Sequence, residues 1–333
     1  MKTTLILLMA SALAAQEAHF TATKQLTFGG ANAEAYYSPD GSKIIFQATR
    51  EGYKCDQMYV MNSDGSDQHM ISNGKGRTTC GFFLPDGKSI MYASTHEAGP
   101  ECPPDPDRSK GYLWGVYASY DIYLADLSGK ITGKFLPSPG YDAEATINWK
   151  TKKVIFTSVR DGDLNLWSAD LDGSHLTELT KKLGYDGGAV FSPDGKKILW
   201  RAHYPTAPDD VKDYKDKLAQ ELVAPMKMEL MIADADGKNA RQITDYGCAS
   251  FAPAFSPDGK KIIFSSNKNK CDSRYFDLFL INPDGTGLEQ VTSVGDFNSF
   301  PMFSPDGKHL VFISNRDAKA RYEFNIFVAD WKN

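Results

Sequence analysis

The sequence lacks the local motifs that mark many enzyme classes. It contains no Gly-x-Ser-x-Gly elbow, no His-Glu-x-x-His zinc motif and no phosphate-binding glycine loop. Its five cysteines include no pair with the spacing of zinc ligands. The net charge of −5 gives no strong attraction to nucleic acid or anionic lipid. We therefore expect a binding protein rather than an enzyme, and no nucleic acid partner.

Apolar runs long enough to span a membrane are also missing. The run near the amino terminus is too short for a transmembrane helix. Because Lys2 precedes this run and small residues follow it, residues 1–15 are predicted to be a signal peptide cleaved near Ala14 or Ala15. No cysteine follows that could carry a lipid anchor, and no Asn-x-Ser/Thr acceptor occurs. We expect a bacterial protein of the periplasm or the extracellular space.

What the sequence does contain is a repeated turn. The tetrapeptide Ser-Pro-Asp-Gly is followed each time by polar residues and an apolar run, as in Lys43-Ile44-Ile45-Phe46. Copies stand at residues 38–41, 192–195, 256–259 and 304–307, with variants at residues 84–87 and 148–151. A spacing of roughly 40–50 residues indicates an array of similar supersecondary units.

One unit, residues 254–292, illustrates the expected structure. Its first strand ends at Phe255, and Pro257 and Gly259 occupy positions that suit a tight turn. Further strands rich in β-branched and aromatic residues are expected at residues 262–265, 277–281 and 290–292. A four-stranded antiparallel meander of this kind is the blade of a β-propeller.

The chain contains six such units, so we predict an all-β, six-bladed β-propeller that forms a single domain over residues 24–330. The first strands are expected near Ala33, Cys80, Ala143, Gly187, Phe251 and Ser299. The sixth unit lacks a fourth strand. Residues 24–27 repeat the fourth-strand pattern at the start of the chain and are predicted to complete the last blade, which removes a free sheet edge.

Two blades carry insertions between their second and third strands. The insertion of blade two, residues 97–118, is rich in proline and glycine and includes Tyr112 and Trp114. The insertion of blade four, residues 205–227, is predicted to contain one short amphipathic helix that begins with Asp209 as its cap and ends at Pro225. Its apolar positions are Val211, Tyr214, Leu218 and Leu222. We expect this helix to pack on the propeller rather than to bind a partner.

The Ser-Pro-Asp-Gly-Lys-x-Ile turn, the Asp-Gly turn and the terminal Gln-Leu-Thr strand resemble the repeats of the TolB-like β-propeller family. Related blades occur in tricorn-type and prolyl-oligopeptidase-type peptidases. The resemblance covers about residues 24–330 and implies an exported binding propeller. The sequence shows neither the amino-terminal α/β domain of TolB nor a hydrolase domain, so the resemblance implies neither a role in envelope maintenance nor peptidase activity.

Polar residues recur at one position of the inner strands. In a propeller, the loops between blades and those between second and third strands share one rim, here called the upper rim. The turns of the repeat lie on the lower rim. The residues expected at the upper end of the channel are Asn32, Thr78, Asp142, Asp186, Ser250 and Asn298. Two residues further along the strands stand Glu34, Cys80, Glu144, Gly188, Ala252 and Phe300. Because residues two apart on a strand share a face, Asp142 and Glu144 are expected to point together, with Asp186 beside them.

These polar groups allow two interpretations. They could cap strand ends and hold water in the channel. They could instead form an acidic pocket for a basic group, a peptide amine or a hard divalent cation such as Ca²⁺.

Two histidines follow the second strands of the inserted blades. His96 and His203, with Glu97 and Asp142, could form a metal or acid–base site, or they could be loop histidines that bind local backbone. Three arginines also occupy one repeated position, each before an acidic residue: Arg50 before Glu51, Arg160 before Asp161 and Arg316 before Asp317. We expect a salt bridge repeated in several blades, with a substrate carboxylate clamp as the alternative.

The cysteines all fall on the predicted upper rim, and export permits disulfides. Cys248 and Cys271 are predicted to pair across the upper loop of blade five. Cys80 is expected to pair with either Cys55 or Cys102, which leaves one thiol free.

Two hypotheses follow. The first is an exported propeller that binds a peptide, protein segment or glycan at its upper face and channel mouth, without a cofactor. Its ligand contacts would be Asp142, Glu144, Asp186, Glu34, Asn32, Asn298, Tyr112 and Trp114. The second is a metal-dependent hydrolase or lyase at the channel mouth, in which the metal-ligand and base roles would be shared by His96, His203, Glu97, Asp142, Glu144 and Asp186.

Overall fold

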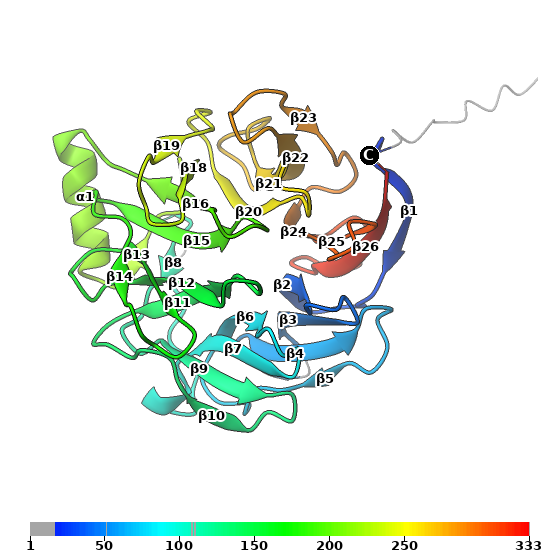
Figure 1. The fold of residues 1–333 in the computed structure, drawn as a ribbon, viewed down its shortest axis with the longest axis horizontal. Coiled ribbons are helices and arrows are strands. Elements are labelled where there is room, and N and C mark those ends of the chain that lie inside the picture. Colours follow the sequence, from blue (N-terminus) through cyan, green and yellow to red (C-terminus); the bar gives the residue numbers. More distant parts are fainter. Residues whose placement is uncertain (1–16, 51, 108, 110, 333) are drawn as a thin grey trace, which may run out of the picture.

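A computed structural model describes residues 17–50, 52–107, 109 and 111–332, and it forms a ring of six four-stranded antiparallel sheets around a central channel (Figure 1). The predicted signal peptide lies outside the described residues. The predicted all-β propeller with one short inserted helix is therefore confirmed. No described helix has the length and apolar character that a membrane crossing requires.

Each blade runs from an inner strand that lines the channel to an outer strand at the periphery. Blades one and two consist of β2 (Ala31–Tyr37), β3 (Lys43–Thr49), β4 (Gln57–Asn62) and β5 (His69–Met70), then β6 (Thr78–Phe83), β7 (Ser89–Ser94), β9 (Asp121–Asp126) and β10 (Ile131–Lys134). Blades three and four consist of β11 (Asp142–Ile147), β12 (Lys153–Ser158), β13 (Asn165–Asp170) and β14 (Thr177–Glu178), then β15 (Tyr185–Phe191), β16 (Lys197–His203), β18 (Glu229–Asp234) and β19 (Arg241–Gln242). Blades five and six consist of β20 (Ser250–Phe255), β21 (Ile262–Ser266), β22 (Asp277–Ile281) and β23 (Glu289–Gln290), then β24 (Asn298–Phe303), β25 (His309–Ser314), β26 (Asn325–Trp331) and β1 (Phe20–Gln25).

The first strand of the chain closes the ring, as predicted. β1 pairs antiparallel with β26, with Lys24 opposite Val328. The pairing begins at Phe20, earlier than the sequence pattern indicated, and the Leu26 N–H still donates to the Ile326 carbonyl at 2.8 Å. Blade six therefore contains strands from both ends of the chain (Figure 1).

Repeated side-chain hydrogen bonds explain the Ser-Pro-Asp-Gly turn. In the turn at residues 38–41, the Ser38 hydroxyl donates to Asp40 at 2.6 Å and accepts from the Lys43 N–H, while Asp40 accepts from the Ser42 N–H. The copies at residues 192–195, 256–259 and 304–307 repeat these bonds. The glycine that ends each copy has φ between 71° and 73°, where a β-carbon would be strained. The tetrapeptide is therefore a turn requirement and not a catalytic motif.

The core lies between neighbouring blades. Ile44 and Phe46 of blade one pack with Val311 and Ile313 of blade six in one buried cluster. Second strands such as β21 and β25 are buried on both faces because they contact a blade on each side. Hydrophobic burial therefore holds the ring together.

The insertions differ in detail from the prediction. Helix α1 covers Pro208–Leu218, so it ends before Leu222 and Pro225, and Asp209 lies in its first turn and does not cap it. Leu222 belongs to β17 (Leu222–Val223), which pairs with β8 (Trp114–Gly115) from the insertion of blade two. A 3-10 turn, η1 (His96–Ala98), begins that insertion. The two insertions therefore join above the ring, a contact that helical periodicity does not reveal.

Candidate functional site

A backbone bulge repeated in all six inner strands builds the channel wall. The six bulged residues have φ between 49° and 59°, a left-handed conformation, and each lies at a shift in strand register; they are Glu34, Cys80, Glu144, Gly188, Ala252 and Phe300. A bulge breaks the alternation of side chains along a strand. Residues on either side of it therefore do not share a face.

For this reason the predicted grouping of Asp142, Glu144 and Asp186 is wrong. Asp142 is fully buried, accepts from Ser138 and pairs with Arg160 at 2.9 Å. Asp186 is also fully buried and accepts hydrogen bonds from the Trp200 indole at 2.6 Å and the Tyr204 hydroxyl at 2.5 Å. Neither aspartate lines the central cavity, whereas Glu144 does.

The predicted asparagines are structural as well. The Asn32 amide donates to the carbonyl oxygens of Gly29 and Phe324, which ties blade one to blade six. Asn298 accepts from the Ser314 hydroxyl at 2.8 Å. The interpretation that this ring of polar residues caps strand ends therefore holds for these two asparagines and both buried aspartates.

The channel contains a cavity of about 580 Å³. Its lower end is formed by the prolines of the repeated turns, Pro39, Pro85, Pro193, Pro257 and Pro305. Apolar side chains continue the wall, including Tyr36, Phe82, Trp149, Phe191, Phe255, Met302 and Phe303. Glu34, Cys80, Glu144 and Arg201 form a polar layer among its lining residues. A volume of this size suits a small ligand or a side chain of a larger one.

Arg201 and Glu144 satisfy each other within this layer. Their side chains form an ion pair, and both are about nine-tenths buried. Glu144 also accepts hydrogen bonds from Thr157, from the Gly188 N–H at 3.0 Å and from the Tyr185 hydroxyl. Arg201 donates to the Tyr185 hydroxyl at 2.7 Å. Arg201 was not among the predicted site residues, although an arginine between Trp200 and Ala202 in the largely buried strand β16 was a usable signal.

Glu34 has a different electrostatic environment. Burial and, to a smaller extent, the neighbouring Glu144 raise the pKa of its carboxyl, Arg201 opposes them, and the net result is a pKa of about 7. The Cys80 thiol lies beside Glu34, and burial together with the Glu34 charge raises the pKa of that thiol. Cys80 is therefore a thiol and not a thiolate near neutral pH, which disfavours a nucleophilic role.

The predicted aromatic contacts lie above this layer. The Trp114 ring lies 5.0 Å from the Arg201 guanidinium and packs edge-on against Tyr185 and Phe251. Tyr112 is 45% exposed and stacks with the guanidinium of Arg274 on blade five. The insertion of blade two thus reaches across the upper side of the polar layer, whereas the turn prolines line the cavity at the lower rim. Neither Tyr112 nor Trp114 is among the residues that line the cavity.

The predicted metal residues do not converge. His96 contacts the Ser94 hydroxyl at 3.0 Å and packs on Tyr123, while His203 contacts the Lys227 carbonyl at 3.3 Å. Burial lowers the pKa of both histidines. Glu97 pairs with Lys134 at 2.5 Å. Among the described residues, no three His, Cys, Asp or Glu side chains come together as metal ligands.

Two of the three repeated arginines form salt bridges, but with other acidic residues than predicted. Arg160 pairs with Asp142 and not with Asp161, and Arg316 pairs with Glu17 at 2.9 Å and not with Asp317. Each guanidinium also lies over the aromatic residue four positions earlier in its strand, at 4.9 Å from Phe156 and 4.7 Å from Phe312. Arg50 lies over Phe46 in the same way, and its predicted partner Glu51 is outside the described residues.

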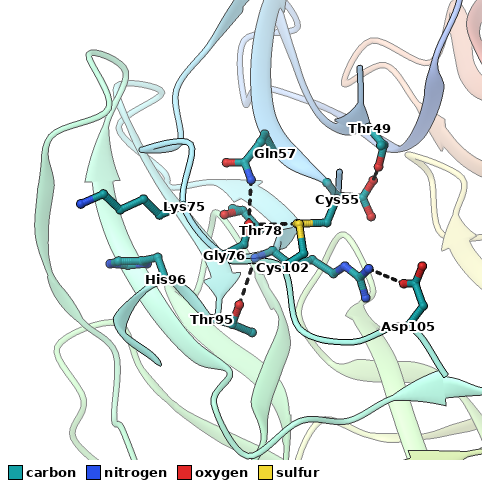
Figure 2. Close-up of a disulfide and its surroundings, with 12 residues drawn as sticks. Thr49, Cys55, Gln57, Lys75, Gly76, Thr78, Thr95, His96, Cys102 and Asp105 are labelled. Atoms are coloured by element: carbon teal, nitrogen blue, oxygen red, sulfur yellow. Dashed lines mark hydrogen bonds and ion pairs between the residues drawn. A yellow bond between two sulfur atoms is a disulfide. The ribbon is translucent and has the colours of Figure 1, made fainter. Parts of the chain in front are cut away.

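Four of the five cysteines form two disulfides. Cys248 pairs with Cys271, as predicted. Cys55 pairs with Cys102 in the upper loops, so both predicted partners of Cys80 are wrong (Figure 2). Cys80 is free because its bulge directs it to the channel. The Cys55–Cys102 bridge anchors the insertion of blade two to blade one.

Comparisons with known proteins agree with this architecture. Residues 214–332 match PD40, the TolB beta propeller domain family. The chain is 26% identical over 179 residues to the uncharacterized peptidase YuxL of Bacillus subtilis, a match that covers 54% of this chain but only 23% of that protein.

Among solved structures, TolB from Acinetobacter baumannii superposes with a TM-score of 0.55 and 20% identity, over 79% of this chain and 55% of that chain. An oligogalacturonate lyase in complex with manganese superposes with a TM-score of 0.54 and 14% identity, over 93% of both chains. Identities this low establish the fold alone. The described residues thus form a six-bladed β-propeller, and residues 214–332 match the TolB beta propeller domain family.

Proposed function

We propose that this chain is an exported propeller that binds a peptide or protein segment in its central cavity, with entry from the lower rim. The cavity carries the proposal. It combines an apolar wall with a charged layer, the arrangement expected of a ligand site. The two disulfides fit an oxidising compartment, in line with the predicted signal peptide.

The composition of the wall favours a peptide over a glycan. Proline, phenylalanine and methionine side chains dominate the lower part of the cavity, and they offer few hydrogen bonds to sugar hydroxyls. They would instead pack against apolar side chains and the stems of long polar ones. Glu34 and the Arg201–Glu144 pair would provide the polar specificity.

A peptide-display selection on the protein without residues 1–15 tests this proposal. The informative variant is Ala252→Phe, because Phe300 occupies the equivalent bulge in blade six and shows that an aromatic side chain fits this backbone. Ala252→Phe is expected to fill part of the cavity and to weaken selected peptides at least tenfold. Leu176→Phe, at an exposed position on blade three, is the matched control. Selected peptides that bind Ala252→Phe as well as the wild type would refute cavity binding.

The predicted alternative, a metal-dependent hydrolase or lyase, has less support. The likeness to the manganese-containing lyase extends to the fold only, and His96, His203 and Glu97 each have separate local partners. Elemental analysis of protein purified without chelators distinguishes the two functions. One bound metal ion per chain would favour the enzyme.

A further inference from the structure

We propose that the polar layer of the cavity is a binding site for an alkylammonium group, such as the side chain of a lysine, with Glu34 as its counter-ion. This inference rests on the proposed function, since it names the group that the bound segment would carry.

The first argument is that Glu34 is the one acid of the polar layer without a strong partner. Glu144 is paired with Arg201 and accepts three further groups, as described above. In contrast, no N–H or O–H group of the described residues donates a hydrogen bond of normal geometry to Glu34. Its nearest hydrogen-bonding neighbour is the Cys80 thiol, a weak donor. Both Glu34 and Cys80 line the cavity, so a ligand can reach the carboxylate.

The second argument is the sign of the charge. Arg201 and Glu144 neutralise each other, so an ionised Glu34 leaves one net negative charge in this layer. Asp56 adds to the negative potential at Glu34. An anionic ligand would have to displace Glu144 from Arg201, whose guanidinium is already covered by Trp114 and bonded to Tyr185. A cation can pair with Glu34 and leave that ion pair intact.

The third argument is the shape and chemistry of the approach. Tyr36, Phe82 and Met302 line the cavity together with Glu34. A flexible methylene chain packs along such a wall and carries a compact ammonium group at its end. A bare divalent cation fits less well, because no three carboxylate, histidine or cysteine side chains of the described residues converge there.

The environment of Glu34 makes binding depend on pH. The titratable and charged groups that act on Glu34 are Glu144, Arg201, Cys80, Asp56 and the Tyr36 hydroxyl. Because the pKa of Glu34 is raised to about 7, its carboxyl is largely ionised only above neutral pH. An ammonium group binds the ionised form, so its affinity should fall roughly tenfold between about pH 8 and about pH 6.

Calorimetric titration with pentylamine, pentanol and pentanoate tests the site without knowledge of the natural segment. Pentylamine is expected to bind, and the alcohol and the acid are expected to bind at least tenfold more weakly. Glu34→Gln should reduce pentylamine affinity at least tenfold and abolish its pH dependence. Glu101→Gln, an exposed change in the insertion of blade two, should have no effect. Ala252→Phe provides a second test, because it should exclude pentylamine while Glu34 is retained.

The outcomes separate this inference from the proposed function. Equal binding of pentanol and pentylamine, or unchanged pentylamine binding by Glu34→Gln, would overturn the alkylammonium site. If selected peptides bind and Ala252→Phe excludes them, but replacing their lysines by norleucine has no effect, the proposed function stands and the inference fails. If pentylamine binds through Glu34 and no peptide is selected, the site stands and the peptide function fails.

Discussion

Replacing Gly188 by alanine should damage the channel far more than its small size suggests. Gly188 has φ of 59°, and a β-carbon there would lie 1.9 Å from Nη1 of Arg201 and 2.8 Å from its Cζ. The guanidinium would have to move, yet Glu144 and Tyr185 hold it from one side and Trp114 covers it from another. The substitution therefore disturbs the buried ion pair as well as the backbone.

Two terms set the expected magnitude. An L-residue in the left-handed region costs about 1–2 kcal/mol. Ala252 shows that alanine adopts this conformation at the equivalent position of blade five. Breaking a buried ion pair by loss of one partner costs about 3–5 kcal/mol, which is an upper limit here because Arg201 is displaced and not removed. We expect Gly188→Ala to lower the free energy of unfolding by about 3–5 kcal/mol in total.

Urea denaturation measures this loss, with Gly87→Ala as the matched control. Gly87 also has positive φ, at 63°, but a β-carbon there would have no atom within 4 Å. Its substitution should therefore cost only the backbone term, about 1–2 kcal/mol. Adding Arg201→Met to Gly188→Ala should remove the steric conflict, so that the two changes together cost less than their sum. Equal losses for Gly188→Ala and Gly87→Ala would refute the steric argument.

Three further predictions concern stability. Glu34 has a pKa of about 7 in the folded state against 4.5 for an unperturbed glutamate, so its contribution to stability falls as pH rises through this interval. The free energy of unfolding of Glu34→Gln, relative to that of the wild type, should therefore be up to about 3 kcal/mol higher at pH 8 than at pH 5, as measured by urea midpoints at both pH values. If the stability difference between Glu34→Gln and the wild type is the same at pH 5 and pH 8, the raised pKa of Glu34 is contradicted. Replacing Cys248 and Cys271 by serine opens a loop with a sequence separation of 23 residues and should cost about 3 kcal/mol in thermal denaturation; a loss below about 1 kcal/mol would argue against a stabilising bridge. Phe20→Ala should lower the free energy of unfolding by about 3 kcal/mol because Phe20 is buried in the closing strand. Thr21→Ala, on the exposed side of that strand, should lower it by less than about 0.5 kcal/mol. Similar losses at both positions would show that backbone hydrogen bonds alone hold the strand.

The sequence predicted the architecture well because each blade repeats the same local rules. The turn at residues 38–41, the apolar second strand after it and the fourth-strand pattern at residues 24–27 depend on near neighbours or on copies of themselves. Counting repeats therefore yielded six blades and the closing strand. Helix α1 was also found, since Val211, Tyr214 and Leu218 lie on one face, but its end was misplaced because Leu222 pairs with a strand about a hundred residues away.

The site was predicted less well because one assumption about strands does not hold there. Alternation of side chains placed Asp142 and Glu144 on one face, and the bulge at Glu144 separates them. The equivalent bulge in blade two turns Cys80 into the channel, so the position of Cys80 in the sequence suggested the wrong pairing. Left-handed φ at Glu34, Cys80 or Phe300 has no signature in these residue types. Glycine at position 188 was the only residue whose type pointed to this conformation.

The joined ends of blade six have a practical consequence. The His19 imidazole and the Lys332 carbonyl are 2.9 Å apart, and the Lys332 N–H donates to the His19 carbonyl at 2.8 Å. A linker of a few residues could therefore connect position 332 to position 19, and new termini could be opened in an exposed turn such as the one at Asp236 and Gly237. In a circularly permuted protein of this kind, β19 would begin the chain and β18 would end it, so the ring would close in blade four instead of blade six. The permutation would let the order of blade synthesis be varied while the finished ring stays the same.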